Sequence, residues 1–156
     1  AREHRATSPL PRAHPAFKCL WLSVVVFGVG GFLGLFVDGA DTRTPAHYHG
    51  VIGGVNLVFI GLFMSFFLPL MGRAVGIGRS ISALIHMYAW GQMLASIGLF
   101  LAGGYGAPRK TAGDAQGLEA MGAVFGMYLN GVGALIAVIG GTMFIWICAK
   151  ALLRRA

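Results

Sequence analysis

The chain alternates long apolar stretches with short polar ones. Four apolar segments, about residues 17–37, 50–71, 81–101 and 121–149, account for most of its 156 residues. Each has at least the roughly 20 residues that a membrane-spanning helix needs. We therefore predict an all-α integral membrane protein with four transmembrane helices.

The composition supports this prediction and leaves no segment for a separate soluble domain. Only 11% of the residues are charged, against roughly a quarter in soluble domains. Residues 1–16 carry three Pro and three Arg with little apolar periodicity. They are expected to form an irregular cytoplasmic tail before a transmembrane domain at 17–156. The first apolar segment has no small-residue cleavage pattern after it, so we interpret it as a retained helix rather than a signal peptide.

The net charge of +7 reports topology rather than nucleic-acid binding, because basic residues of membrane proteins collect on the cytoplasmic side. Nine of the twelve basic residues flank one side of the predicted spans. This distribution predicts that both termini are cytoplasmic. Cys19 and Cys148 lie near the same, reducing side, so no disulfide is expected. The nine residues are Arg2, Arg5, Arg12, Lys18, Arg73, Arg79, Lys150, Arg154 and Arg155.

The opposite side mixes charges of both signs. Its two loops hold three basic residues and four of the five acidic ones. Such mixing is found both in sites for charged groups and in solvated loops, and the sequence leaves the two interpretations open. The residues are Arg43, Arg109, Lys110, Asp38, Asp41, Asp114 and Glu119.

Three GxxxG pairs lie within the apolar segments, and small residues at this spacing let helix backbones approach closely. The pairs fit ordinary tight packing, a piece of a larger bundle, or a bundle with room for a bulky planar ligand. They are Gly30 with Gly34, Gly50 with Gly54, and Gly122 with Gly126.

Two histidines stand one residue apart at the start of the second segment, in "TPAHYHG". Thr44 and Pro45 fit the cap and first position of a helix, which places His47 and His49 in its first turns. Two positions apart means roughly 200° around the axis, so the rings cannot share one metal ion. Imidazole is a common axial ligand of haem iron. The spacing therefore predicts a helix between two haems, and simple interfacial histidines are the alternative.

At this point the sequence resembles the C-terminal third of the catalytic subunit of haem-copper oxidases. The stretch "AHYHGVIGGVNLVFIGLFMSFFLPLMGR" is similar to the tenth helix of that family, which opens with a His-aromatic-His motif. The stretch "VFGVGGFLGLFVDGADTRTP" resembles the ninth helix and its loop, and "GLFLAGGYGAPRK" the end of the eleventh helix. The resemblance covers about residues 20–152. It implies that the four helices correspond to helices nine to twelve of a larger bundle.

The resemblance implies roles for five residues. His47 would bind the iron of a high-spin haem and His49 that of a low-spin haem, with Tyr48 between them. Arg109 and Lys110 would bind haem propionates, because cations at the membrane face neutralise buried carboxylates. Lys110 stands where the family has Arg, so it lacks the planar fork that makes two parallel contacts.

Two further positions resemble the family less closely. Asp41 precedes the histidine helix where the family has a metal site, but the family's preceding His is Ala40 here, so Asp41 is considered as a metal ligand without being assigned. His86 falls at a position that is often His, and a packed or hydrogen-bonded histidine is the simpler interpretation. Asn56 and Gln92 are expected to meet a partner helix or water within the span.

The ligands for the other side of the low-spin haem and for the copper or other second metal are absent from the sequence. The resemblance thus implies one part of a split haem-copper oxidase subunit I of a bacterial inner membrane, in lipid. A membrane partner chain would carry the remaining helices and share two haems, and further oxidase subunits would include one for electron entry. The chain would be enzymatic only in that complex, with electrons passing from the low-spin to the high-spin haem and reducing oxygen. A nitric oxide reductase-like subunit, or a non-catalytic haem-carrying or structural subunit, is the alternative.

Overall fold

The computed structural model describes residues 12–37, 39–111 and 113–154, and this part of the chain is helical without a named strand. Four stretches are long and apolar enough to cross a membrane. The predicted all-α fold with four such helices is therefore confirmed. The elements in chain order are α1 Pro15–Gly34, α2 Arg43–Leu62, η1 Phe63–Phe67, α3 Leu68–Leu70, α4 Arg79–Gly104, η2 Gly113–Gln116 and α5 Met121–Leu153.

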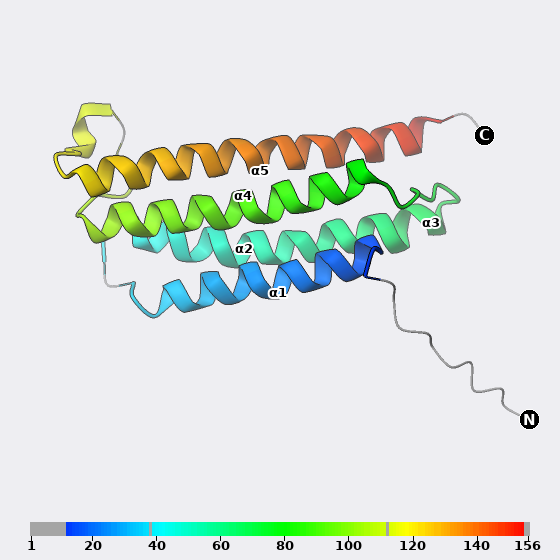
Figure 1. The fold of residues 1–156 in the computed structure, drawn as a ribbon, viewed down its shortest axis with the longest axis horizontal. Coiled ribbons are helices and arrows are strands. Elements are labelled where there is room, and N and C mark those ends of the chain that lie inside the picture. The colour runs from blue at the N-terminus through cyan, green and yellow to red at the C-terminus, as the bar shows by residue number, and fades with distance from the viewer. Residues whose placement is uncertain (1–11, 38, 112, 155–156) are drawn as a thin grey trace, which may run out of the picture.

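The long helices lie side by side along one axis (Figure 1). Helix α4 contacts α1, α2 and α5, and α5 packs mainly against α4. The start of α1 and the end of α5 lie at the same end of the bundle. The other end carries the loop between α1 and α2 and the loop between α4 and α5.

Helix α2 begins at Arg43, two residues before the predicted first helical position at Pro45. Helix α1 begins at Pro15, where the side chain of His14 accepts a hydrogen bond from the Ala16 amide. Helix α1 therefore starts two residues before residue 17, where the transmembrane domain was predicted to begin. Most of the predicted tail, residues 1–11, lies outside the described residues.

Glycine contacts bring the helices together, as the GxxxG spacing indicates. A Cβ on Gly30 would lie 2.6 Å from the carbonyl carbon of Gly50, and one on Gly98 would lie 2.6 Å from the carbonyl oxygen of Gly126. Gly98 belongs to α4, and no glycine of α4 is part of the three predicted GxxxG pairs. Close backbone approach of this kind maximises van der Waals contact where no hydrophobic effect drives helices together.

Helix α2 continues through a π-helical turn, η1, into the short α3. Pro69 has no amide hydrogen and its ring cannot fit against the carbonyl four residues earlier. The amide of Leu68 instead donates to the carbonyl of Phe63, five residues back. The wider turn lets the span continue to Leu70, and the sequence pattern did not predict it.

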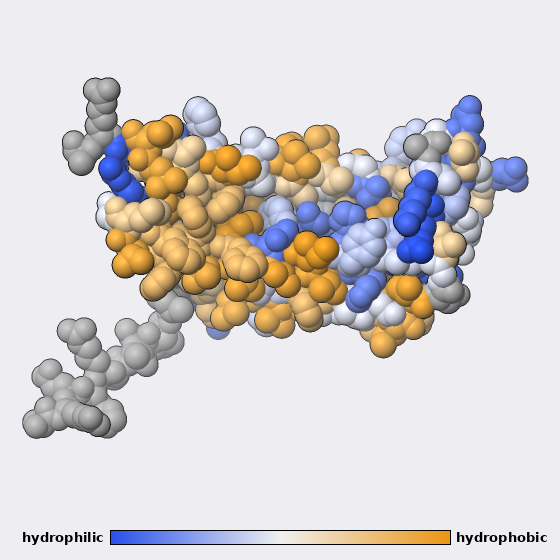
Figure 2. All heavy atoms as spheres, turned by 180° about the vertical axis from the view of Figure 1, so that it is seen from behind, coloured by the Kyte–Doolittle hydropathy of each residue, from blue (hydrophilic) through white to orange (hydrophobic). Residues whose placement is uncertain are grey.

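Apolar side chains cover much of the outside of the bundle. Helix α5 is the least buried span, with 22% of its apolar window inside the bundle against 33–44% for the others. On the face seen in Figure 2, hydrophilic residues reach inward from the loop end toward the middle, and the other half is mostly hydrophobic. Such exposure fits a bundle whose helices meet lipid or further helices.

Candidate functional site

The histidine-bearing end of α2 starts two residues earlier than the sequence predicted. Thr42, and not Thr44, is the cap residue, and Pro45 is the third helical position. Asp41 explains the difference, because its Oδ1 accepts a hydrogen bond from the Arg43 amide at 2.8 Å and satisfies the first amide of the helix. The Thr44 hydroxyl donates to the Gly39 carbonyl. Pro45 is tolerated there because the first-turn amides have no partner within the helix.

His47 is half-buried against α1. Its Nδ1 lies 2.8 Å from the carbonyl oxygen of Gly30, and a Cβ on Gly34 would lie 2.5 Å from the same nitrogen. A carbonyl can only accept, so Nδ1 carries the hydrogen and Nε2 of the neutral ring has the free lone pair. A backbone carbonyl on one ring nitrogen is the usual arrangement for a histidine that binds a metal through the other.

His49 lies in different surroundings. It is exposed, and its ring stacks beside the exposed Tyr48 with centroids 5.3 Å apart and planes tilted by 31°. Around the helix axis, Ala46 and Gly50 lie between His47 and His49, and both face the interior of the bundle. The two imidazoles therefore face different neighbours. Within the described residues, no three His, Cys, Asp or Glu side chains gather to hold a metal ion directly.

The two loops at this end pair with each other. Asp41 and Pro108 form an antiparallel bridge. The Arg109 amide donates to the Ala40 carbonyl at 2.9 Å, and the Thr42 amide donates to the Ala107 carbonyl at 3.0 Å. This pairing brings the segment with Arg109 beside the start of the histidine helix.

The two predicted propionate-binding cations differ in setting. Arg109 is half-buried and lies close enough to Asp41 to lower its pKa. Lys110 is exposed and has a φ of 62°, the left-handed region that non-glycine residues rarely adopt. Both stand at the same end of the bundle as His47 and His49, but neither is described in contact with an imidazole.

Asp41, considered as a metal ligand, is already bound by Arg43. Its Oδ2 accepts from Nε at 2.9 Å and from Nη2 at 2.7 Å. The hydrogen bond from the Arg43 side chain is the main reason that the pKa of Asp41 lies below its usual value, and the charge of Arg109 adds to it. Both carboxylate oxygens are thus engaged with Arg43, and within the described residues Asp41 belongs to no group of three or more His, Cys, Asp or Glu that could hold a metal ion.

Two apolar grooves flank α2 below the histidines. One has a volume of ≈430 Å³ between α1 and α2, and Gly54 and Val58 in its lining follow His47 by seven and eleven residues. The other has a volume of ≈370 Å³ between α2, α4 and α5, and Asn56 and Ile60 in its lining follow His49 by the same steps. Steps of seven and eleven return to nearly the same helix face. Each histidine therefore shares a face of α2 with one groove, which begins about two turns farther along the helix.

The groove on the His49 side contains one polar pair. Asn56 Nδ2 donates to the hydroxyl of Tyr88 at 2.9 Å, so the predicted partner of Asn56 is a side chain of α4. Gln92, the other amide expected to meet a neighbour, packs against Gly53 of α2.

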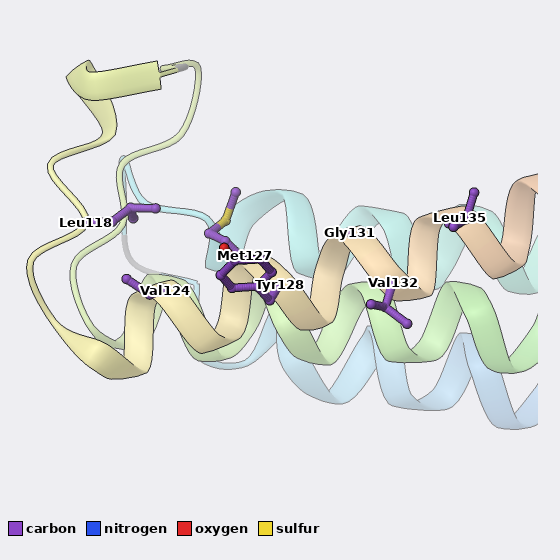
Figure 3. Close-up of a pocket in the computed structure, with 7 residues that line it drawn as sticks. All are labelled: Leu118, Val124, Met127, Tyr128, Gly131, Val132 and Leu135. Carbon is purple, nitrogen blue, oxygen red and sulfur yellow. The ribbon is translucent and has the colours of Figure 1, made fainter.

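A further cavity of ≈490 Å³ lies along α5 and is lined by Leu118, Val124, Met127, Tyr128 and neighbouring residues. Figure 3 shows Leu118 reaching toward α5 from the loop before it, beside the side chain of Met127. Its lining holds no histidine, acid or cation. The same is true of the two grooves beside α2, and this cavity differs from them in that no residue of α2 lines it.

His86 lies in the second turn of α4, at the end of the bundle away from His47 and His49 (Figure 1). Its Nδ1 donates to the Ser82 carbonyl at 2.7 Å, and the Ser82 hydroxyl accepts from Lys18 at 2.7 Å. His86 is thus hydrogen-bonded within the bundle. Cys19 and Cys148 are free and buried.

Sequence reasoning missed Gly30 and Asp41 as the residues that orient this site. Gly30 was noted only as a packing glycine, although it supplies the carbonyl for His47. Asp41 lies two residues before Arg43, and an aspartate at this spacing commonly bonds to a backbone amide at a helix start. The sequence pattern was instead interpreted as a helix cap at Thr44.

No family model matches the chain. An uncharacterized protein of Rickettsia prowazekii (strain Madrid E) is 33% identical over 150 residues, which cover 89% of this chain but 29% of that protein. The chain thus spans less than a third of the length of this relative.

Proposed function

We propose that this chain is the haem-binding C-terminal part of a haem-copper oxidase-like catalytic subunit, corresponding to its helices nine to twelve. The observation that carries the proposal is the hydrogen bond from His47 Nδ1 to the Gly30 carbonyl. This bond fixes the ring and leaves Nε2 as a ligand, while His49 faces other surroundings two residues later. One helix thereby offers two separate axial ligands.

The residues of this chain fit haem as the bound group. Along the same face of α2, an apolar groove begins about two helical turns beyond each histidine and could take the apolar edge of a flat macrocycle, although neither lining includes an imidazole. The volumes, ≈370 and ≈430 Å³, lie within the range of small-molecule and cofactor sites. The glycines Gly50, Gly53 and Gly54 of α2 are packed against α1 and α4, so the grooves, and not the glycine positions, are the space open to a macrocycle.

Arg109 and Lys110 would receive the propionates of these haems. The pairing of the two loops holds Arg109 at the histidine end of α2 through backbone hydrogen bonds. A cation there neutralises carboxylates that would be costly to leave unpaired at the membrane face. Asp41 holds Arg43 in an ion pair and keeps that segment in place.

The chain lacks ligands for a complete centre. Of its five histidines, His86 is committed to the opposite end of the bundle and His14 caps α1. The second axial ligand and the copper or other second metal would come from residues outside these 156, and we propose that a partner membrane chain carries them. The match to less than a third of a longer relative supports the view that this unit works as one part of a larger helix bundle.

When bound by His49 and His47, the two haems would supply electron transfer and oxygen reduction. The chain's own residues would hold, orient and neutralise them. The basic residues at the ends of α1 and α5 favour a cytoplasmic position for both termini. We place the protein in the inner membrane of a bacterium.

The test compares His47→Ala and His49→Ala, separately, in the complex purified with its partner chain. Loss of the high-spin absorption only in His47→Ala and of the low-spin absorption only in His49→Ala is expected, with half the pyridine-haem content in each. His86→Ala is the matched control and should retain both signals. Full haem content in both variants would refute the proposal and leave a structural subunit as the function.

A further inference from the structure

A small pocket at the end of the bundle opposite to the histidines combines cations with an apolar floor. It has a volume of ≈260 Å³ and lies between residues 74–76, after α3, and the last turns of α5. Lys150 and Arg154 line it together with Ile147 and Ala151. Because Lys150 and Arg154 are four residues apart, their side chains project from the same side of the helix.

The pocket is held closed on one side by a specific contact. Arg73 Nη1 donates to the carbonyl oxygen of Arg154 at 2.7 Å. This hydrogen bond ties the segment after α3 to the end of α5.

The charges at this pocket have no acidic counterpart in the sequence nearby. No Asp or Glu occurs between Asp41 and Asp114 or after Glu119. Lys150 and Arg154 are both exposed, and the Lys150 ammonium lies 5.9 Å from the centre of the Trp146 ring. A tryptophan beside a lysine at the end of a spanning helix is typical of the membrane interface.

We propose that this pocket binds the phosphate group of an anionic membrane lipid. Lys150 and Arg154 would contact the phosphate, while Ile147, Ala151 and Val75 would meet the upper part of the acyl chains. The position at the end of two spanning helices, with cations above an apolar floor, favours a lipid over a soluble anion. The pocket is separate from the proposed haem site, so either proposal can fail without the other.

The test uses the protein purified in detergent, titrated with phosphatidylglycerol or phosphatidylcholine and followed by native mass spectrometry. Lys150→Gln with Arg154→Gln should weaken binding of the first phosphatidylglycerol about 25-fold, because each cation near an anionic headgroup contributes about a factor of five. The exchange Lys150→Arg with Arg154→Lys should keep it within about twofold. Arg12→Gln with Arg79→Gln, which removes the same charge from exposed residues outside the pocket lining, is the matched control and should change it less than about twofold.

Three results would overturn the proposal. The first is an equal loss in the control variant, which would indicate general charge attraction. The second is phosphatidylcholine binding as tightly as phosphatidylglycerol. The third is inorganic phosphate displacing the lipid at equal concentration, which would indicate a soluble-anion site. Thermal unfolding of each variant shows whether the bundle remains folded.

Discussion

Gly30 joins helix packing and histidine orientation in one residue, so Gly30→Ala should disturb both. A new Cβ would lie 2.6 Å from the carbonyl carbon of Gly50 and 2.8 Å from its Cα. Ordinary carbon contacts are about 3.5 Å or longer. Backbone atoms cannot rotate away, so α1 and α2 must separate by about 1 Å.

This separation has two consequences. Overpacking of a tight contact costs about 1–3 kcal/mol. The hydrogen bond between His47 Nδ1 and the Gly30 carbonyl, now 2.8 Å long, would lengthen toward ~3.8 Å if the carbonyl moves with its helix, which is beyond hydrogen-bond range. Its loss adds about 1 kcal/mol. The free energy of unfolding should therefore fall by roughly 2–4 kcal/mol.

Denaturation of the purified protein by sodium dodecyl sulfate measures the first effect. Nuclear magnetic resonance of ¹⁵N-labelled histidine measures the second, because a free ring exchanges between tautomers whereas the bonded ring keeps its hydrogen on Nδ1. Gly31→Ala is the matched control, since a Cβ there meets nothing within 4 Å. If Gly30→Ala were as stable as Gly31→Ala with an unchanged His47 signal, the close contact of α1 and α2 would be wrong.

Two other changes test the histidine end of the bundle. Thr42→Val removes a buried hydroxyl that donates to the Leu99 carbonyl at 2.7 Å, and should lower the free energy of unfolding by about 1 kcal/mol. Ser96→Ala removes a buried hydroxyl without a described partner and should be neutral or stabilising in the same denaturation assay. Asp41→Asn removes the ion pair with Arg43, so hydrogen exchange in residues 40–43 and 107–109 should rise. The lowered pKa of Asp41 stabilises the native protein at neutral pH, and this contribution is lost as pH falls through that pKa; an Asp41→Asn protein with the same acid sensitivity of exchange would contradict this.

The spans were predictable because a bilayer imposes length and apolarity on every helix that crosses it. The chemistry of single positions was harder to predict. Thr44 followed by Pro45 resembles a helix start, but the Asp41 carboxylate reaches the Arg43 amide first and moves the start of α2 to Arg43. The π-helical turn at η1 follows from Pro69, yet a proline in a span is equally compatible with a simple kink.

The pairing of the two loops could not be predicted from the sequence. The Ala40 carbonyl and the Arg109 amide are 69 positions apart in the chain, and only the packing of α2 on α4 brings them together. The environments of His47 and His49 were partly predictable, because the helix period alone separates them around the axis. His47 meets α1 because the Gly30 carbonyl accepts its hydrogen bond and Gly34 leaves space for its ring. No local sequence pattern links these two glycines to His47.

A helix that presents two ligands to two different sites must be fixed against rotation. A rotation of 20° about the axis moves a group at the helix surface, about 5–6 Å from the axis, by about 2 Å. That shift is enough to break a ligand bond on both sides at once. Gly50 and Gly54 set α2 against Gly30 and Phe27 of α1, and Gly53 sets it against Gln92 of α4. The small residues of α2 therefore do more than permit close packing, because they define the angle at which His47 and His49 leave the helix.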